Sequence, residues 1–177
     1  MGVEMRATMY YLAVRQFART LKNLDAVLNK AEEYALGRGF DVNNLVNARL
    51  APDMLPFVVQ VRIACDNAKM GAANLAQKPA PKHEDNETTF EEIHGRIAKC
   101  LSFIDSLGEA DFAKTTADTV VPLAYPAGKA LRAEEYLFGR QIPNFYFHVV
   151  TAYDILRQGG VPLGKNDYLG ELGLIDA

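Results

Sequence analysis

The chain has 177 residues, 49% of them hydrophobic and 23% charged, a composition typical of a soluble globular protein with a sizeable core. We therefore expect a single domain over residues 1–177. The formal net charge of −3 argues against a nucleic-acid partner, because phosphate binding favours a basic surface. No apolar run reaches the roughly 18–20 residues of a membrane-spanning helix. With only two cysteines and no disulfide framework, the sequence favours a cytoplasmic protein without a membrane partner.

The first two predicted helices cover residues 5–36 and 53–77. In the first, apolar residues recur at spacings of three to five until Gly37 and Gly39 end the pattern. The second is predicted to begin at Asp53, a residue type suited to the N-cap. Its inner face carries small apolar residues, which allow a neighbouring helix to approach closely.

A proline-rich, charged segment at 78–87 separates the second helix from the third, and we expect it to be solvated. An extended segment of this length spans about 30 Å. It is therefore long enough to cross over between two parallel helices. The third helix is predicted at 89–107, with Thr88 and Glu91 forming a T-x-x-E capping box at its start.

The period of the sequence changes at 119–132. Val120 and Val121 favour a strand, and the Pro-Ala-Gly sequence that follows shortly afterwards favours a turn. This pattern predicts a small β-hairpin with both strands inside the segment.

The last long helix is predicted at 143–158, after a short helix at 133–140. Pro143 suits a first helical turn, because its missing N–H has no partner to lose there, and Gly159 suits the end. We expect the tail at 166–177 to pack back onto the molecule. Four long helices with irregular connections predict an all-α four-helix bundle, with the β-hairpin inserted before the last helix.

The best candidate site combines Asn144 and His148 on the last helix with Gln60 on the second. Asn144 and His148 are four residues apart, so they project from one helix face. His148 would be a metal ligand or general base, or alternatively a buried histidine hydrogen-bonded to an amide. Gln60, which lies among small apolar residues, would meet His148 across the bundle or be a satisfied core amide.

Other polar residues are weaker candidates. Arg49 and Asp53 could form an ion pair that orders the start of the second helix, or could anchor a substrate in the pocket. We expect His94 at the boundary of the third helix, and Cys65 and Cys100 as buried thiols. The sequence contains no H-E-x-x-H, Walker or G-x-S-x-G motif.

Four segments resemble an uncharacterised bacterial domain-of-unknown-function family within the DinB/YfiT-like four-helix-bundle superfamily. They are LDAVLNKAEEYA, NARLAPDMLPFVVQV, TTFEEIHGRIAKC and PNFYFHVVTAYDILRQGGVPLGKNDYLG, and the resemblance covers nearly the whole chain. It implies a single-domain bundle with a small β insertion, a homodimer, and a crossover between the second and third helices.

The resemblance also implies a site. Well-studied members of the superfamily look like metal-dependent enzymes, some transferring small thiols, whose metal is bound by three histidines. On that pattern His148 matches the second histidine of an H-x-x-x-H pair, Asn144 the first, and Gln60 lies near the remaining ligand. One imidazole and two neutral amides are a weak donor set for zinc or nickel.

Two functions therefore remain open from the sequence. The first is a metal-dependent, thiol transferase-like enzyme that binds a small molecule in a pocket between the second and last long helices, with His148 as ligand or base. The second is a non-catalytic ligand-binding or structural homodimer, in which a polar core network takes the place of the metal site.

Overall fold

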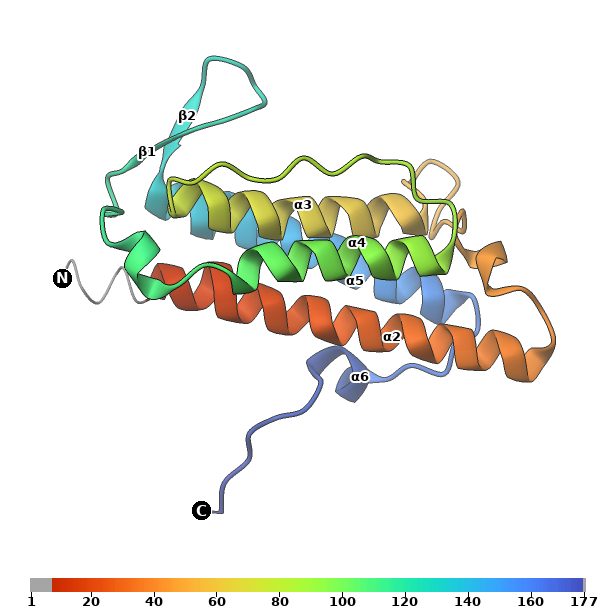
Figure 1. The fold of residues 1–177 in the computed structure, drawn as a ribbon. Helices are drawn as coiled ribbons and strands as arrows, with labels where there is room; N and C mark the ends of the chain where they lie inside the picture. Colours follow the sequence, from red (N-terminus) through yellow and green to blue (C-terminus); the bar gives the residue numbers. More distant parts are fainter. Residues whose placement is uncertain (1–7, 177) are drawn as a thin grey trace.

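The computed structural model describes residues 8–176, which form a bundle of long helices (Figure 1). The four long helices are α2 (Phe17–Arg38), α3 (Phe57–Leu75), α4 (Phe90–Asp105) and α5 (Ile142–Gln158). Short 3₁₀ turns, η2 (Val42–Leu45) and η3 (Glu109–Phe112), lie in the connections after α2 and α4. No helix within residues 8–176 combines the length and hydrophobicity that a bilayer crossing requires.

The helices are arranged as two parallel pairs. α2 and α5 run in one direction and α3 and α4 in the other (Figure 1). α3 packs against both α4 and α5, whereas α2 lies against α4 and α5. Because α3 and α4 are parallel neighbours, the crossover segment between them (residues 78–88) has to return along the length of the bundle, as Figure 1 shows.

Each helix buries one apolar face. On α4 the buried residues are three or four positions apart, as in an amphipathic helix: Phe90, Ile93, Ile97, Cys100 and Ile104. On α3 the buried face includes Ala64, Ala68 and Ala72. Such small side chains bring neighbouring backbones close together, which positions the polar residues of α3 against α5.

Both cysteines are free and fully buried where α3 meets α4. The Sγ–H of Cys100 donates a hydrogen bond of 3.1 Å to the carbonyl oxygen of Cys65. The hydrogen bond with Cys100, together with burial, raises the pKa of the Cys65 thiol well above its usual range. The prediction of two buried thiols is confirmed.

The start of α4 differs by one residue from the prediction. Thr89, not Thr88, is the N-cap, and its Oγ1 accepts a 3.2 Å hydrogen bond from the backbone N–H of Glu92. The Glu92 carboxylate in turn accepts from the N–H of Thr89 at 3.1 Å. The sequence contains two overlapping T-x-x-E patterns, and the second one makes Phe90, which is buried, the first helical residue.

The start of α3 was also predicted too early. Asp53 lies exposed in the preceding loop, and the N-cap is Pro56, whose backbone is extended. A proline disfavours the helical conformation of the residue before it. A helix that began at Asp53 would have to pass through Leu55 in that conformation, so α3 begins only after Pro56.

The last long helix begins earlier than Pro143. Residues 133–158 are continuously helical, and the π-helical turn η4 (Glu135–Gln141) leads directly into α5. Inside an α-helix a proline loses a hydrogen bond and clashes with the carbonyl four residues earlier. The wider i→i+5 pattern of η4 alters the backbone at this point and accommodates Pro143 without ending the helix.

A second π-helical turn, η1 (Tyr11–Gln16), precedes α2 in the same way. The helix is continuous from residue 8 to Arg38, so the predicted start at residue 5 lies outside the described residues. It ends at Gly39, whose φ of 72° is the left-handed conformation that glycine adopts readily.

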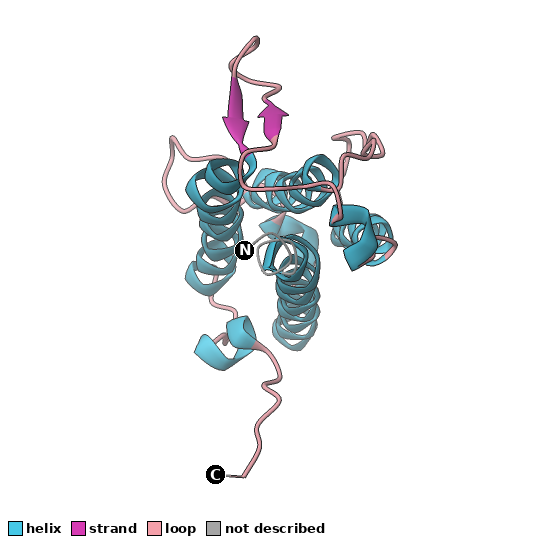
Figure 2. Ribbon diagram, turned by 90° about the vertical axis from the view of Figure 1, so that its left-hand side faces the viewer, coloured by secondary structure: helices cyan, strands magenta, loops and turns pink. Residues whose placement is uncertain are grey.

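The predicted hairpin is confirmed. Strands β1 (Val120–Pro122) and β2 (Ala130–Arg132) pair antiparallel, with Val121 opposite Leu131. Figure 2 shows the hairpin projecting from the bundle beside its helices.

The tail packs back onto the bundle only in part. The short helix α6 (Lys165–Leu169) lies against α2, where Asn23 Nδ2 donates to the carbonyl oxygens of Tyr168 and Leu169 at 3.1 and 2.9 Å. Beyond it the chain runs away from the bundle (Figure 1), and Leu174 is 84% exposed. The expectation for the tail is correct for α6 and for Glu171, whose carbonyl oxygen accepts a hydrogen bond from Arg19 of α2, and wrong for the exposed end at Leu174 and Ile175.

The crossover segment is fixed by a buried arginine rather than merely solvated. Arg96 on α4 has a side chain only 1% exposed and forms an ion pair of 2.9 Å with Asp66 on α3. It also pairs with Asp85 and Glu87 of the crossover segment at 3.0 and 3.1 Å. Glu87, itself buried, makes a second ion pair with Arg62 of α3 at 2.6 Å. These contacts tie the segment to both parallel helices.

We expect Arg96→Met to lower the free energy of unfolding by about 3 kcal/mol, because it leaves the surrounding carboxylates without their buried cation. The matched control is Arg132→Met, which removes an ion pair with Asp118 whose side chains are 74% and 78% exposed. The control substitution should lower the free energy of unfolding by about 0–1 kcal/mol. Urea unfolding of both variants measures the difference, and equal losses would contradict a structural role for Arg96.

Candidate functional site

A series of polar contacts joins α3 to the η4–α5 helix. On α3 the contributing residues are Gln60, Asn67 and Asn74, spaced by seven residues and therefore on one helix face. Their partners on the facing helix are His148, Asn144 and Tyr136, in that order. We call this set the amide ladder.

The first contact is between His148 and Gln60. The Gln60 Oε1 lies 2.7 Å from His148 Nδ1, and Gln60 Nε2 donates a 3.0 Å hydrogen bond to the carbonyl oxygen of Leu55. Because the hydrogen bond to Leu55 fixes the orientation of the Gln60 amide, Gln60 Oε1 is the acceptor and His148 Nδ1 carries the proton. Both side chains are buried, and burial lowers the pKa of His148. His148 is therefore neutral at pH 7, with its proton directed at an amide.

The second contact is between Asn144 and Asn67. Asn144 Nδ2 donates a 2.9 Å hydrogen bond to Asn67 Oδ1, and Asn67 Nδ2 donates to the carbonyl oxygen of Ile63 at 3.0 Å. The sequence placed Asn144 in one cluster with Gln60 and His148. The structure brings Gln60 and His148 into contact and gives Asn144 a different partner, one turn along the same interface.

The third contact is between Asn74 and Tyr136. Asn74 Nδ2 donates to the Tyr136 hydroxyl at 2.8 Å, and that hydroxyl donates to the carbonyl oxygen of Met70 at 3.3 Å. Eight residues separate Tyr136 from Asn144, against seven between Asn67 and Asn74. The π-helical turn uses the additional residue, because its hydrogen bonds close one residue later than those of an α-helix. The additional residue thereby keeps Tyr136 opposite Asn74 while Asn144 remains opposite Asn67.

A cavity of about 610 Å³ lies beside the second and third contacts, under the loop that leaves β1. A volume of this order is typical of small-molecule sites. Its polar lining comes from Asp66, Asn67, Asn74, Tyr136, Arg140, Gln141 and Asn144, and its apolar lining from Ile63, Met70, Pro122, Leu123 and Ala124. Gln60 and His148 are not part of this lining, so the cavity and the His148 contact are neighbouring but separate features.

Arg140 is held in place at the edge of the cavity. Its Nη1 donates a 2.9 Å hydrogen bond to Gln141 Oε1, and Gln141 Nε2 donates to the carbonyl oxygen of Asn67 at 3.1 Å. Gln141 is only 1% exposed, so the support behind Arg140 is rigid. Among the ion pairs of the described residues none involves Arg140.

The remaining candidates lie away from this cavity. Arg49 donates to the carbonyl oxygen of Met54, and no ion pair joins it to Asp53 in the described chain, where both residues are exposed. The predicted pairing of Arg49 and Asp53 is therefore wrong, because the arginine satisfies a loop carbonyl instead. His94 faces α2, with Nδ1 2.6 Å from Asp25 Oδ1.

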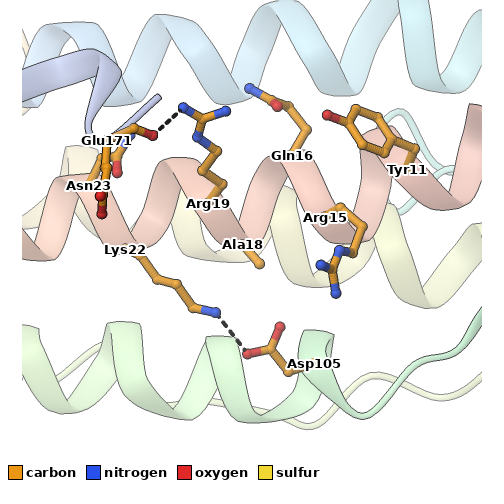
Figure 3. A pocket seen from close by; sticks show the side chains of 9 residues that line it. All are labelled: Tyr11, Arg15, Gln16, Ala18, Arg19, Lys22, Asn23, Asp105 and Glu171. Atoms are coloured by element: carbon orange, nitrogen blue, oxygen red, sulfur yellow. Dashed lines mark hydrogen bonds and ion pairs between the residues drawn. The ribbon is translucent and has the colours of Figure 1, made fainter. Parts of the chain in front are cut away.

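A second groove, of about 440 Å³, runs along α2 (Figure 3). Its basic side chains hold the surrounding elements together. Lys22 forms an exposed ion pair of 3.3 Å with Asp105 of α4, and Arg19 Nη2 donates to the carbonyl oxygen of Glu171 at 2.7 Å. Arg15 also lines the groove. The cavity beside α3, with its buried amides, is the better candidate site.

Sequence reasoning missed most of the residues that line the cavity. Asn67 and Asn74 were not identified, although their seven-residue spacing from Gln60 is a signal that they share its face. Tyr136 and Arg140 were assigned only to a short connecting helix. Their role depends on the π-helical turn, for which the sequence shows no local signal.

Comparison with known proteins identifies the family. Residues 9–169 match the family described as domain of unknown function DUF1993. The chain belongs to this family. A crystal structure of a DinB family member protein from Shewanella denitrificans is 42% identical to the chain, with a TM-score of 0.94 and 100% of each chain covered. The chain is thus DinB-like in sequence and fold. No curated protein matches it.

The metal that the DinB-like resemblance implies does not suit the residues present. Within residues 8–176 no group of three or more His, Cys, Asp or Glu residues is arranged to hold a metal ion. At the corresponding positions, Gln60 Oε1 already accepts the proton of His148, and the Asn144 amide is bonded to Asn67. Neutral amide oxygens are in any case poor ligands for zinc or nickel.

We expect His148→Ala to lower the free energy of unfolding by about 1–3 kcal/mol, because Gln60 Oε1 loses its donor and a cavity forms. His148→Asn restores part of the hydrogen bonding and should cost less. Thermal melts of the wild type and both variants, with and without a chelator, test this order. A chelator-induced fall in the wild-type Tm that both variants abolish would contradict it and restore the metal hypothesis.

The two helical histidines should affect stability with opposite dependence on pH. The hydrogen bond to Asp25 raises the pKa of His94, with Glu32 acting in the same direction against a smaller effect of burial. Its stabilisation is fully present below the unfolded pKa of about 6.5 and is lost as pH rises through the raised folded pKa. Burial lowers the pKa of His148, so its contribution is present above the unfolded pKa of about 6.5 and is lost as pH falls from there through the lowered folded pKa.

Urea unfolding between pH 5 and 8 of the wild type, His94→Gln and His148→Asn measures both effects. The stability difference between wild type and His94→Gln should shrink with rising pH, and the difference for His148→Asn should grow. The same sign of slope for both variants would refute the assignment.

Proposed function

We propose that this DinB-like protein binds a small polar molecule, without a metal, in the cavity between α3 and the η4–α5 helix. The single observation that supports this is the cavity of about 610 Å³, lined by amides and a phenol whose hydrogen bonds to one another fix them before any ligand arrives. Such preorganised polar groups on rigid helices, set among apolar side chains, are typical of small-molecule sites.

Binding is favoured over catalysis by the chemistry of the lining. The lining side chains are amides, one phenol, one guanidinium and one carboxylate, with no His, Cys or Ser among them. The carboxylate, Asp66, is already engaged in ion pairs with Lys69 at 2.8 Å and Arg96 at 2.9 Å. The thiol transferase-like alternative therefore has no nucleophile or base within this lining.

We also propose that the protein is a homodimer. The family resemblance implies it, and two large apolar side chains on α5 support it. Phe147 and Val150, three residues apart on one helix face, are 58% and 40% exposed. Exposed apolar residues that share a face are typical of protein contacts. Light scattering of the wild type and Phe147→Asp tests this, and a monomeric wild type would contradict it.

The binding proposal is tested by filling the cavity. Met70 lines it and is 36% exposed, so Met70→Trp should occupy the space without disrupting the core. A thermal-shift panel of small polar metabolites, including amino acids, hydroxy acids, nucleosides and low-molecular-weight thiols, provides the probes. At one hundred times its Kd, a ligand adds about 2.7 kcal/mol of stability.

We expect at least one compound of the panel to raise the Tm of the wild type and to have no effect on Met70→Trp. The matched control is Leu36→Trp, the same enlargement at a position that is 84% exposed on α2, and it should respond like the wild type. If no compound acts, or if Met70→Trp responds as fully as Leu36→Trp, this cavity is not the site.

A further inference from the structure

The cavity offers a ligand one unpaired cation. Arg140 uses Nη1 on Gln141, and the described chain provides no partner for its Nε and Nη2. The free Nε–Nη2 edge is one of the two that a guanidinium presents to a carboxylate in paired hydrogen bonds. Because Gln141 is itself bonded to the backbone of Asn67 at 3.1 Å, the guanidinium is positioned before a ligand binds.

The same cavity also offers hydrogen-bond acceptors. Asn74 directs its Nδ2 to Tyr136 and Asn144 directs its Nδ2 to Asn67, so the amide oxygen of each residue remains without a partner in residues 8–176. Acceptors of this kind favour a group rich in N–H donors, such as an ammonium.

The third element of the lining is apolar. Ile63, Met70 and Leu123 face the cavity from α3 and from the loop after β1. A ligand that used the polar groups would place its remaining part against these side chains, and burial of aliphatic carbon there contributes to affinity.

From these three features we infer that the ligand is an amino-carboxylate with an apolar side chain, of the α-amino acid class. The carboxylate pairs with Arg140, the ammonium donates to the amide oxygen of Asn144 one turn further along the same helix, and the side chain packs on Ile63, Met70 and Leu123. This inference rests on the proposed function, because it names the ligand class of the same cavity.

Three matched probes separate the contributions in isothermal titration calorimetry. L-Leucine carries all three groups, L-leucinamide lacks the carboxylate, and 4-methylpentanoate lacks the ammonium. The wild type should bind L-leucine, and each analogue should bind at least about tenfold more weakly, the factor expected for a lost hydrogen bond to a charged group. Equal binding of L-leucine and either analogue would overturn the inference.

Arg140→Met tests the residue itself. It should weaken L-leucine binding at least about tenfold and leave the weak binding of L-leucinamide unchanged. Arg140→Lys keeps the charge but loses the paired geometry, so it should bind with intermediate affinity. Arg15→Met, the same substitution at an exposed arginine of the second groove, should bind as the wild type does. L-Leucine affinity that Arg140→Met does not change overturns the inference, and circular dichroism of each variant establishes that it is folded.

The two proposals fail in distinguishable ways. If another class of compound binds and Met70→Trp abolishes that binding, the cavity is a site and the amino-carboxylate assignment is wrong. If no compound of the panel binds, or if Met70→Trp binds L-leucine as the wild type does, the proposal for the cavity fails as well.

Discussion

The parallel pairing of α3 and α4 is the constraint on which the rest of the molecule depends. Parallel neighbours require a connection as long as the bundle, and a charged segment of that length would by composition remain in water. Arg96 supplies the contact that makes this connection part of the structure, because it pairs with the crossover segment and with Asp66 of α3. With α4 fixed on one side of α3, the other side is left for an antiparallel helix. The amide ladder forms there, between α3 and α5.

The side chains of the amide ladder fix the register between α3 and the η4–α5 helix, and some of them also line the cavity. Each contact satisfies polar groups that would be costly to bury alone, so the ladder fixes how far α5 slides along α3. The second and third contacts also leave a limited set of polar atoms available to a ligand in the neighbouring cavity. At the positions where DinB-like relatives of the metal-dependent type are expected to hold an ion, this chain has closed hydrogen bonds between neutral groups. The cavity proposed as the binding site lies on the hairpin side of the same interface, where Pro122, Leu123 and Ala124 line it.

Much of the fold could be predicted from the sequence, whereas the site could be predicted only in part. The helices and the hairpin follow from apolar periodicity and turn residues, which are local properties. The Gln60–His148 contact was anticipated from the small neighbours of Gln60 and from the family resemblance. The pairing of Asn144 with Asn67 depends on the register between two helices, and no local pattern encodes it. The buried Arg96 was missed for a related reason: its partners come from a helix and from a segment that sequence composition assigns to solvent.

Because both thiols are buried between α3 and α4, their reaction with an alkylating reagent reports when these two helices separate. Cys65 and Cys100 lie on α3 and α4, the helices that the crossover segment joins, and neither is accessible in the folded chain. An alkylating reagent can react only when these two helices separate, and the raised pKa of Cys65 suppresses its thiolate until then. Fraying of α6 and the tail exposes no cysteine, so it leaves the labelling rate unchanged. Alkylation kinetics in native buffer would therefore measure the opening of this half of the bundle alone, without any engineered probe.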